Sequence, residues 1–307
     1  MSIATIDRIP DRIRAVRSRH PGRWVSGVIV LAIVAGLVYA FATSPFINYG
    51  FVAQYQFTGP ILGGLELTIV YSVLAEVIGV GVGILVAVMR LSPNRLLSYA
   101  SAFYIWLFRG VPILVQILLW YNIALIFPTL GIGIPFTSIG YTVSTNAVIT
   151  TFVAGILALS LNEGAYMAEI VRAGILSIDK GQSEAAQAIG LSPLQAMRLV
   201  VLPQAIRVII PPTGNDFISM LKTTSLVSAI SGAELLTQAE RIYSTNFRTI
   251  ELLFVASIWY LALTTLASVG QHYVEKHFSR GTGMEARSTL AGRVRANLRV
   301  GRVRGGR

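Results

Sequence analysis

The 307-residue chain contains no cysteine. Disulfides, thiolate zinc sites and cysteine nucleophiles are therefore excluded, and the sequence leaves the redox compartment open. Charged residues are also scarce, at 13% of the sequence, whereas 54% of the residues are hydrophobic. A soluble core would not absorb so much apolar sequence, so the composition indicates a polytopic membrane protein.

Motifs typical of enzyme active sites are absent as well. The three histidines, His20, His272 and His277, lack the spacing of a zinc site. The sequence has no nucleophile elbow and no G-x-x-x-x-G-K-[ST] phosphate-binding loop. We therefore expect no catalytic residue, no metal site and no cofactor in this chain. If ATP drives the protein, a partner subunit has to bind it.

The net charge of +11 is concentrated at the two ends of the chain. Residues 1–23 carry six Arg against two Asp, a net charge of +4, and residues 271–307 carry one Lys and eight Arg against two Glu, a net charge of +7. By the positive-inside rule, both tails are predicted to be cytoplasmic. They lack the interleaved aromatic residues of a nucleic-acid platform, so contact with anionic lipid headgroups is favoured and no nucleic acid partner is expected.

Six apolar segments are long enough to cross roughly 30 Å of hydrocarbon. They are predicted at 25–42, 61–89, 99–127, 147–170, 205–221 and 250–270. The first is too long for the apolar core of a cleavable signal peptide and is predicted to be a transmembrane helix. Six crossings place both basic tails on the same side. The predicted fold class is therefore all-α, a polytopic membrane protein with about six transmembrane helices.

Glycine and proline mark special positions within these spans. Gly79 and Gly83 form a small-xxx-small pair that would let a neighbouring helix approach closely. Pro112 is expected to bend the third span. Pro211 and Pro212 are expected to break or kink the fifth.

Three segments between spans are predicted to lie outside the cytoplasm, and the first is the uncharged loop at 44–60. Residues 128–146 carry no charge and contain glycine and proline, which indicates an external loop. Residues 222–250 carry charges of both signs. Within them we expect a short re-entrant or surface helix around 229–238.

Carboxylates within the spans are the candidate pathway residues. Glu163 in the fourth span and Asn215 with Asp216 in the fifth are predicted to lie at similar depth, and Glu76 lies near the middle of the second. An ionised carboxylate costs several kcal/mol in hydrocarbon unless it is paired or hydrated. Each therefore marks either a substrate pathway or an ion pair, and both interpretations stay open for Glu163 and Asp216. The direction in which Glu76 faces is not predicted.

A polar segment at 181–205 lies between the fourth and fifth spans, and it is predicted to contain two short helices joined by a sharp turn. Gly190 lies where a left-handed residue ends a helix at little cost. Residues 192–195, Ser-Pro-Leu-Gln, supply an N-cap, a proline at the first helical position and a capping-box glutamine. Pro203 is expected to limit the second helix.

This segment also carries a sequence signature. It resembles Glu-Ala-Ala-x3-Gly-x9-Ile-x-Leu-Pro, the signature of permease subunits of bacterial ATP-binding-cassette importers, with one conservative change of Ile to Val. The matching residues are Glu184, Ala185, Ala186, Gly190, Val200, Leu202 and Pro203. Further matches at 109–112 with Gln116, at 165–175, at 203–205 and at 222–226 make the chain similar to the polar amino acid permeases, the type that takes up histidine, glutamine and glutamate. The resemblance covers about 57–270.

The resemblance implies a domain organisation. A five-helix type I importer permease core at 57–270 would follow the extra transmembrane helix at 24–43. The basic tails at 1–23 and 271–307 would flank them in the cytoplasm. The segment 181–205 would be the coupling segment that docks on the ATPase. Its implied coupling residues are Glu184, Ala185, Ala186, Gly190, Leu202 and Pro203.

The resemblance also implies a function and its partners. The chain would translocate amino acids, as one permease of a pair that is either homodimeric or heterodimeric. Two ATP-binding cassette ATPase subunits would bind ATP, and an extracytoplasmic solute-binding protein would deliver the solute. The implied location is the bacterial inner, cytoplasmic membrane, with a multi-pass topology and both termini in the cytoplasm. Glu163, Asn215 and Asp216 are the candidates for the substrate pathway.

Two alternatives remain at this point. The solute could be another small molecule, such as an opine or an amino acid derivative. A stand-alone secondary transporter would use the same carboxylates with an ion gradient, but it would not need an exposed, doubly capped cytoplasmic turn and would often show repeat symmetry. A membrane-embedded enzyme lacks any catalytic constellation.

Overall fold

The structure is a computed structural model, and it describes residues 21–133 and 140–278. It divides into two compact units, residues 1–48 and 49–307. Most of the two predicted basic tails, at 1–23 and 271–307, lies outside the described residues.

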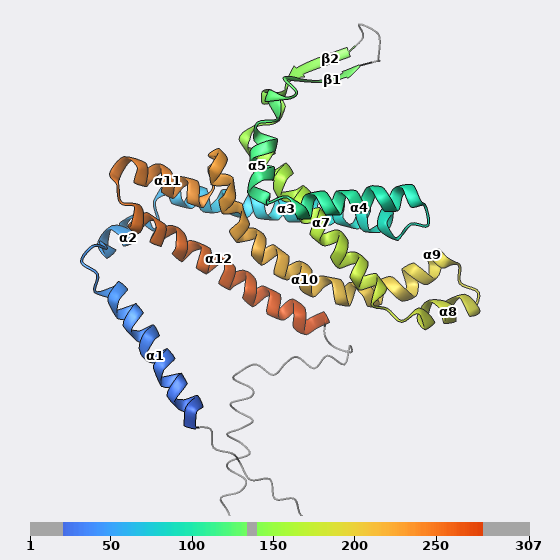
Figure 1. Ribbon diagram of the computed structural model, residues 1–307, viewed down its shortest axis with the longest axis horizontal. Helices are drawn as coiled ribbons and strands as arrows, with labels where there is room; N and C mark the ends of the chain where they lie inside the picture. Colours follow the sequence, from blue (N-terminus) through green and yellow to red (C-terminus); the bar gives the residue numbers. More distant parts are fainter. Residues whose placement is uncertain (1–20, 134–139, 279–307) are drawn as a thin grey trace, which may run out of the picture. The chain divides into compact units, whose positions relative to one another are not determined.

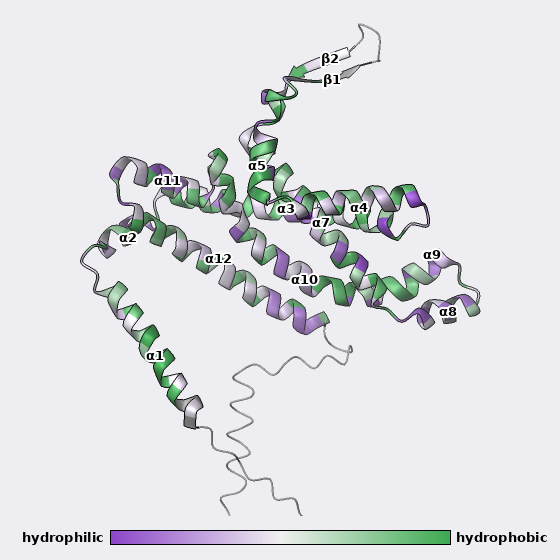
Figure 2. Ribbon diagram, in the orientation of Figure 1, coloured by the Kyte–Doolittle hydropathy of each residue, from purple (hydrophilic) through white to green (hydrophobic). Residues whose placement is uncertain are grey.

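The described part of the first unit, residues 21–48, contains one long helix, α1 (Pro21–Ala42). Its residues 25–42 carry no charge, and none of them is buried within the chain. Figure 2 shows the helix as hydrophobic over most of its length. Because an exposed, predominantly apolar helix of this length is stable only in an apolar surrounding, α1 fits the extra transmembrane helix that the sequence predicts.

The second unit is built almost entirely from helices (Figure 1). In chain order its elements are α2 (Tyr49–Tyr55), α3 (Gly59–Leu91), α4 (Arg95–Gly110), α5 (Ile113–Tyr121), the 3-10 turn η1 (Ile123–Leu125), β1 (Thr129–Gly133), β2 (Gly140–Ser144), α6 (Thr145–Val148), α7 (Thr151–Leu176), α8 (Lys180–Ala188), α9 (Pro193–Ala196), the π-helical turn η2 (Met197–Val201), α10 (Leu202–Thr223), the 3-10 segment η3 (Thr224–Ile230), α11 (Leu235–Asn246) and α12 (Thr249–Phe278). Its apolar core is formed mainly by α3, α5, α7 and η3.

Four helices of the described chain are long and apolar enough to cross a membrane, or five if the bent pair α4 and α5 counts as one span. The predicted fourth span, α7, is 26 residues long but is not among them. It carries Glu163, Glu169 and Arg172, and half of its residues are buried inside the bundle. A central helix surrounded by protein tolerates polar residues that a lipid-facing helix does not.

The helices α3 and α7 pack closely along their length. A Cβ atom at Gly79 would lie 2.7 Å from the Cβ of Glu163, and one at Gly83 would lie 2.5 Å from the Cβ of Met167. Both pairs are spaced by four residues on each helix, so the two backbones approach along one row of small residues. The predicted role of the Gly79 and Gly83 pair is confirmed.

The third predicted span is broken rather than gently bent. The axes of α4 and α5 differ by 100° at the Val111-Pro112 break (Figure 1). Pro112 has no backbone N–H, so the carbonyl of Phe108 loses the donor that a continuous helix would provide. The sequence predicts the position of this elbow but underestimates its angle.

The segment 128–146, predicted to be a plain external loop, contains an antiparallel hairpin. β1 pairs with β2 in the register Thr129 to Ser144 and Gly133 to Gly140. Its Thr, Tyr, Val and Ile residues favour strands, whereas its glycines suggest a loop. Because of these glycines, sequence analysis predicted a loop where the structure has a short sheet.

Three prolines expected to interrupt helices lie within a continuous helical path. Pro203 lies in the first turn of α10, and the helical path from Pro193 to Ile230 is continuous. In the wide turn η2, Leu202 N donates to Met197 O, five residues back, and such a turn accommodates a proline that would break a regular helix. The prediction that Pro203 limits the second helix is therefore wrong.

The break expected at Pro211 and Pro212 is also absent, because α10 runs through both prolines. The neighbouring helix α12 supports this turn, where Gln271 Nε2 donates to Pro211 O at 2.7 Å. Gly214 makes room for the contact, since a Cβ at Gly214 would overlap the Gln271 amide.

The helix expected around 229–238 begins later, at Leu235. It is preceded by two left-handed residues, Ser231 and Ala233, with φ of 58° and 59°. The carboxylate of Glu234 caps the helix by accepting from Leu236 N and Thr237 N. Glu234 is fully buried, and Tyr260 of α12 also donates its hydroxyl to it at 2.7 Å. α11 is thereby tied to α12 through a buried carboxylate.

Candidate functional site

Three carboxylates from three helices approach one another inside the second unit. Glu76 comes from α3, Glu163 from α7 and Asp216 from α10. Glu76 and Glu163 are only 8% and 7% exposed, and Asp216 is partly buried. Glu76 lies within electrostatic range of both other carboxylates, and Glu163 lies within range of Asp216. We call these three residues the carboxylate cluster.

The cluster lacks neutralising partners within the described chain. Neither carboxylate oxygen of Glu76 has a hydrogen-bond partner there, and the same holds for Glu163 Oε1 and Asp216 Oδ2. Buried polar atoms are satisfied in the great majority of cases, and buried charges are normally paired. A set of unpaired carboxylates in one place therefore favours a positively charged group that comes from outside the described residues.

The structure brings together two of the three predicted pathway residues. Glu163 and Asp216 belong to the cluster, and Glu76, whose direction the sequence leaves open, joins them from α3. Asn215 is exposed beside the cluster rather than buried in it. On α10 it continues in an exposed polar row with Ser219 and, one turn further, Lys222.

Other charges of α7 are paired, in contrast to the cluster. Glu169 accepts from Arg172, with Oε2 2.6 Å from Nη2. One turn nearer the cluster, the guanidinium of Arg109 from α4 lies 4.8 Å from the centre of the Tyr166 ring, within the range of a cation–π contact. The end of α7 is thus neutralised locally.

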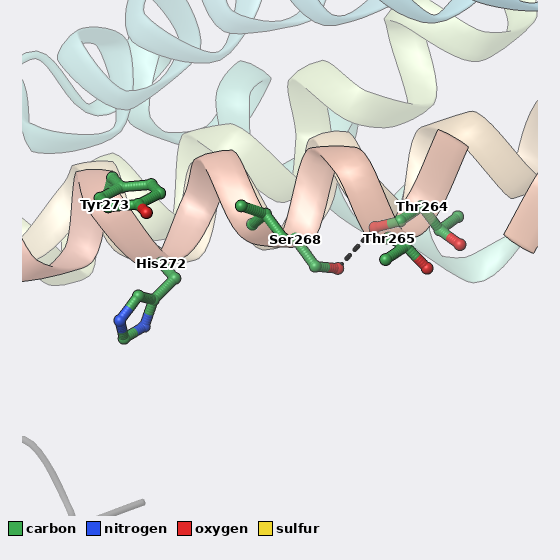
Figure 3. A pocket seen from close by; sticks show the side chains of 6 residues that line it. Thr264, Thr265, Ser268, His272 and Tyr273 are labelled. Atoms are coloured by element: carbon green, nitrogen blue, oxygen red, sulfur yellow. Dashed lines mark hydrogen bonds between the residues drawn. The ribbon is translucent and has the colours of Figure 1, made fainter. Parts of the chain in front are cut away.

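A second polar surface lies on α12. A shallow cavity of about 370 Å³ lies along this helix (Figure 3), and its lining residues are Thr264, Thr265, Ser268, Val269, His272 and Tyr273. Ser268 Oγ donates to Thr264 O at 2.6 Å, and His272 points away from the helix. Because exposed polar groups in a membrane need water or protein beside them, this face of α12 does not suit lipid.

The predicted turn between α8 and α9 is confirmed in detail. Gly190 has a φ of 92°, and the bonds Leu191 N to Ala186 O and Gly190 N to Gln187 O close the C-terminus of α8 as a Schellman motif. Ser192 and Gln195 form both hydrogen bonds of a capping box at the start of α9. The turn is fixed from both sides, so it is a rigid projection.

Most of the predicted coupling residues are accessible. Glu184, Ala185, Gly190, Leu202 and Pro203 are exposed. Ala186 is the exception, since it is 4% exposed and packs inside the chain. A Cβ at Gly190 would meet nothing within 4 Å, so the space above this turn is open.

The two sites offer groups that can bind a solute and a protein partner. Among residues 21–133 and 140–278, no group of three or more His, Cys, Asp or Glu side chains could hold a metal ion. The carboxylate cluster offers several acceptors for a cationic solute, and the α8–α9 turn offers a small-residue surface for a protein partner. Sequence analysis identified Glu76 as a candidate but left its direction open, because helical periodicity alone does not say which face of α3 meets α7.

Two characterised bacterial proteins are similar to the chain. It is 39% identical over 274 residues to the arginine transport system permease protein ArgU of Corynebacterium glutamicum, which covers 89% of this chain and 85% of that protein. It is 35% identical over 230 residues to the L-cystine transport system permease protein TcyB of Bacillus subtilis, which covers 75% of this chain and 91% of that protein. Both relatives match over most of their own length.

Solved structures of ABC transporters are also similar to the chain. A chain from the crystal structure of an amino acid ABC transporter with histidines is 36% identical, with a TM-score of 0.64, over 75% of this chain and 99% of that chain. A chain of the inward-facing MetNI methionine ABC transporter has a TM-score of 0.54 at 20% identity, over 72% of this chain and 94% of that chain, and it supports the fold alone.

The family model described as binding-protein-dependent transport system inner membrane component matches residues 79–280, about two thirds of the chain. This range contains α4 to α12, with Glu163, Asp216 and the α8–α9 turn, and it begins within α3. The predicted resemblance and the predicted all-α permease fold are confirmed, and the chain belongs to the family of binding-protein-dependent transport system inner membrane components.

Proposed function

We propose that this protein is the permease subunit of an ATP-driven amino acid importer, and that it favours solutes with a cationic group. One observation carries the second part of the proposal, the convergence of Glu76, Glu163 and Asp216 without a partner in the described chain. An ammonium or guanidinium group would supply the missing charge and hydrogen-bond donors. The similar arginine permease supports this class of solute.

The proposed pathway runs past the exposed polar faces of α10 and α12. Asn215 and Ser219 on one helix, and Thr265, Ser268 and His272 on the other, are exposed in segments that are otherwise apolar enough to cross a membrane. Such residues face protein or a water-filled cavity. A second permease, either a copy of this chain or a related one, would cover these faces.

The proposed coupling site is the α8–α9 turn. An ATPase subunit would dock on the small exposed residues Ala185 and Gly190, with Glu184 offering a charge to that partner. Each of two ATPases would serve one permease and bind the ATP that this chain has no loop to hold. A solute-binding protein would deliver the amino acid from the opposite side.

The proposed location is the bacterial inner membrane with both termini in the cytoplasm, which the positive charge of the tails supports. The α8–α9 turn would then be cytoplasmic and the hairpin external. In this cysteine-free chain, Ser144→Cys in the hairpin and Gln187→Cys in α8 should react with an impermeant thiol reagent from opposite sides. Labelling of both residues from outside intact cells would contradict this topology.

The experiment that tests the solute proposal is Glu163→Gln in the complete importer, reconstituted in liposomes with its ATPase and its binding protein. Uptake of arginine should fall about tenfold relative to uptake of glutamine, which corresponds to about 1.4 kcal/mol. Binding-protein affinity should stay unchanged. The control is Glu66→Gln, which neutralises an exposed carboxylate of α3 outside the cluster.

The opposite result would be lower thermal stability of Glu163→Gln with an unchanged ratio of arginine to glutamine uptake. Glu163 would then belong to a structural polar group, and the pathway assignment would have to be abandoned.

A further inference from the structure

The elbow between α4 and α5 leaves one backbone carbonyl without its helical donor. In a continuous helix, Phe108 O would accept from the N–H of residue 112, but Pro112 has none. A backbone carbonyl within a membrane bundle requires another donor, because hydrocarbon supplies none. Two side-chain amides, those of Gln116 and Asn162, donate hydrogen bonds to Phe108 O instead.

The first amide belongs to the elbow itself. Gln116 Nε2 donates to Phe108 O at 2.9 Å and to Val111 O at 2.8 Å. The side chain of Gln116 is buried, with 5% of its surface exposed. One amide therefore bridges the last turn of α4 and the break, which fixes the angle within the elbow.

The second amide comes from another helix. Asn162 of α7 donates through Nδ2 to the same Phe108 O at 2.7 Å. Tyr104 OH donates to Leu161 O at 2.7 Å, and Arg109 lies over the ring of Tyr166. These contacts hold the end of α4 against α7 over more than one helical turn.

Asn162 also lies next to a residue of the carboxylate cluster, so its contact with Phe108 O affects the position of that cluster. Asn162 is followed directly by Glu163, whose Cβ lies against Gly79 of α3. On α7, residue 162 thus contacts the elbow while residue 163 contacts α3. A shift of the elbow relative to α7 would therefore move Asn162, and with it the adjacent cluster residue Glu163.

We propose that Asn162 is a positioning residue that locks the α4–α5 elbow to α7 by satisfying the carbonyl that Pro112 leaves without a donor. This proposal deepens the proposed function, because it names the residue that sets the position of Glu163 for the solute. It assigns no contact with the solute to Asn162 itself.

The test is a distance measurement on the complete importer in lipid nanodiscs. Spin labels at Leu119→Cys on α5 and Leu176→Cys on α7 report the position of the elbow relative to α7, since both side chains are more than half exposed. Asn162→Leu, which removes the amide donor, should broaden or shift the distance distribution. Asn162→Gln, which keeps an amide, should restore it at least in part.

A matched control is Asn122→Leu at the end of α5. Asn122 Nδ2 donates to Leu118 O within its own helix. Asn122→Leu therefore removes a side-chain amide hydrogen bond of similar length that does not involve α7. The distance distribution should then stay as in the unsubstituted protein. If Asn162→Leu does not assemble, Asn162→Asp keeps the shape and places an acceptor against Phe108 O, and the same displacement is expected.

Uptake kinetics provide a second readout. Asn162→Leu should raise the KM for arginine uptake about tenfold, the size expected for one buried hydrogen bond, while basal ATP hydrolysis is unchanged. An unchanged distance distribution in both Asn162→Leu and Asn162→Asp would overturn the positioning role. A displaced elbow together with no effect of Glu163→Gln on solute preference would support the lock and reject only the carboxylate pathway.

Discussion

Gly79 of α3 lies so close to Glu163 of α7 that a Cβ at Gly79 would lie 2.7 Å from both the Cβ and the Cγ of that glutamate. Because Gly79 has no side chain, the Cβ and Cγ atoms of Glu163 can occupy this position against α3. Both the packing of the bundle and the geometry of the cluster depend on this contact.

We expect Gly79→Ala to destabilise the protein by about 1–3 kcal/mol, because the added methyl group overpacks the interface of α3 and α7. Gly81→Ala is the matched control, since Gly81 lies on the same helix with nothing within 4 Å of its would-be Cβ. Alanine there should be neutral or slightly stabilising. Thermal unfolding in detergent measures both, and equal melting temperatures of the two variants would contradict the close contact.

A substitution at Gly190 tests the coupling turn. Its φ of 92° strains any branched or bulky residue, and a side chain there would project into the open space in which we place the ATPase. Gly190→Leu should therefore leave membrane insertion intact while uptake falls and ATP hydrolysis no longer responds to the binding protein.

Gly190→Asn separates the two causes of that loss. Asparagine tolerates positive φ better than leucine does, so it should retain more of the turn and more uptake. Normal uptake and normal ATPase stimulation in Gly190→Leu would exclude docking of the ATPase at this turn.

The contact between Gly214 and Gln271 predicts a compensating pair. Gly214→Ala alone should destabilise the protein, because its methyl group would overlap the Gln271 amide. Gln271→Ala alone should also cost stability, about 1 kcal/mol, since it removes the hydrogen bond to Pro211 O. The double variant should be more stable than the sum of the two losses implies, and strict additivity in thermal unfolding would show that the two sites are independent.

Glu234 predicts a pH dependence of stability. Burial raises the pKa of the Glu234 carboxyl above its usual range, although its hydrogen bonds with Tyr260, Leu236 and Thr237 act in the opposite direction. The folded protein therefore binds the proton more tightly than the unfolded chain does. The resulting stabilisation is present below the unfolded pKa of about 4.3 and is lost as the pH rises through the raised folded value.

The measurement compares the unsubstituted protein with Glu234→Gln, which keeps a neutral side chain at every pH. The other carboxyl groups titrate in both proteins, so the difference between their melting temperatures isolates Glu234. Relative to the variant, the unsubstituted protein should lose stability as the pH rises above the unfolded pKa of about 4.3 and through the raised folded pKa. A difference that does not change with pH would contradict the prediction.

Features encoded locally could be predicted from the sequence. The capping box of Ser192 and Gln195 and the left-handed Gly190 depend on neighbours within a few residues, and the structure has both. The spacing of Gly79 and Gly83 is also a local pattern, and it predicts a close helix contact, although only the structure identifies α7 as the partner.

Features decided by another helix could not be predicted. Helical periodicity does not show that Glu76 turns toward Glu163, because α3 is apolar on almost every side. Pro112 marks the elbow, but its angle depends on the amides of Gln116 and Asn162, one of which lies 50 residues away in the sequence. Similarly, the contact of α10 with Gln271 lies 60 residues beyond Pro211.

The continuity of α9, η2 and α10 has a mechanical consequence. From Pro193 to Asp216 the chain is helical without interruption, which at 1.5 Å per residue makes a rod of roughly 35 Å. One end of this rod carries the capped turn, and Asp216 lies far along it. If the ATPase docks at this turn as proposed, a push there would displace Asp216 instead of being absorbed in a loop. The hydrogen bonding of this rod departs from that of a regular α-helix at two places, the π-helical turn at Met197–Val201 and the prolines Pro211 and Pro212, so these are the places where it would bend.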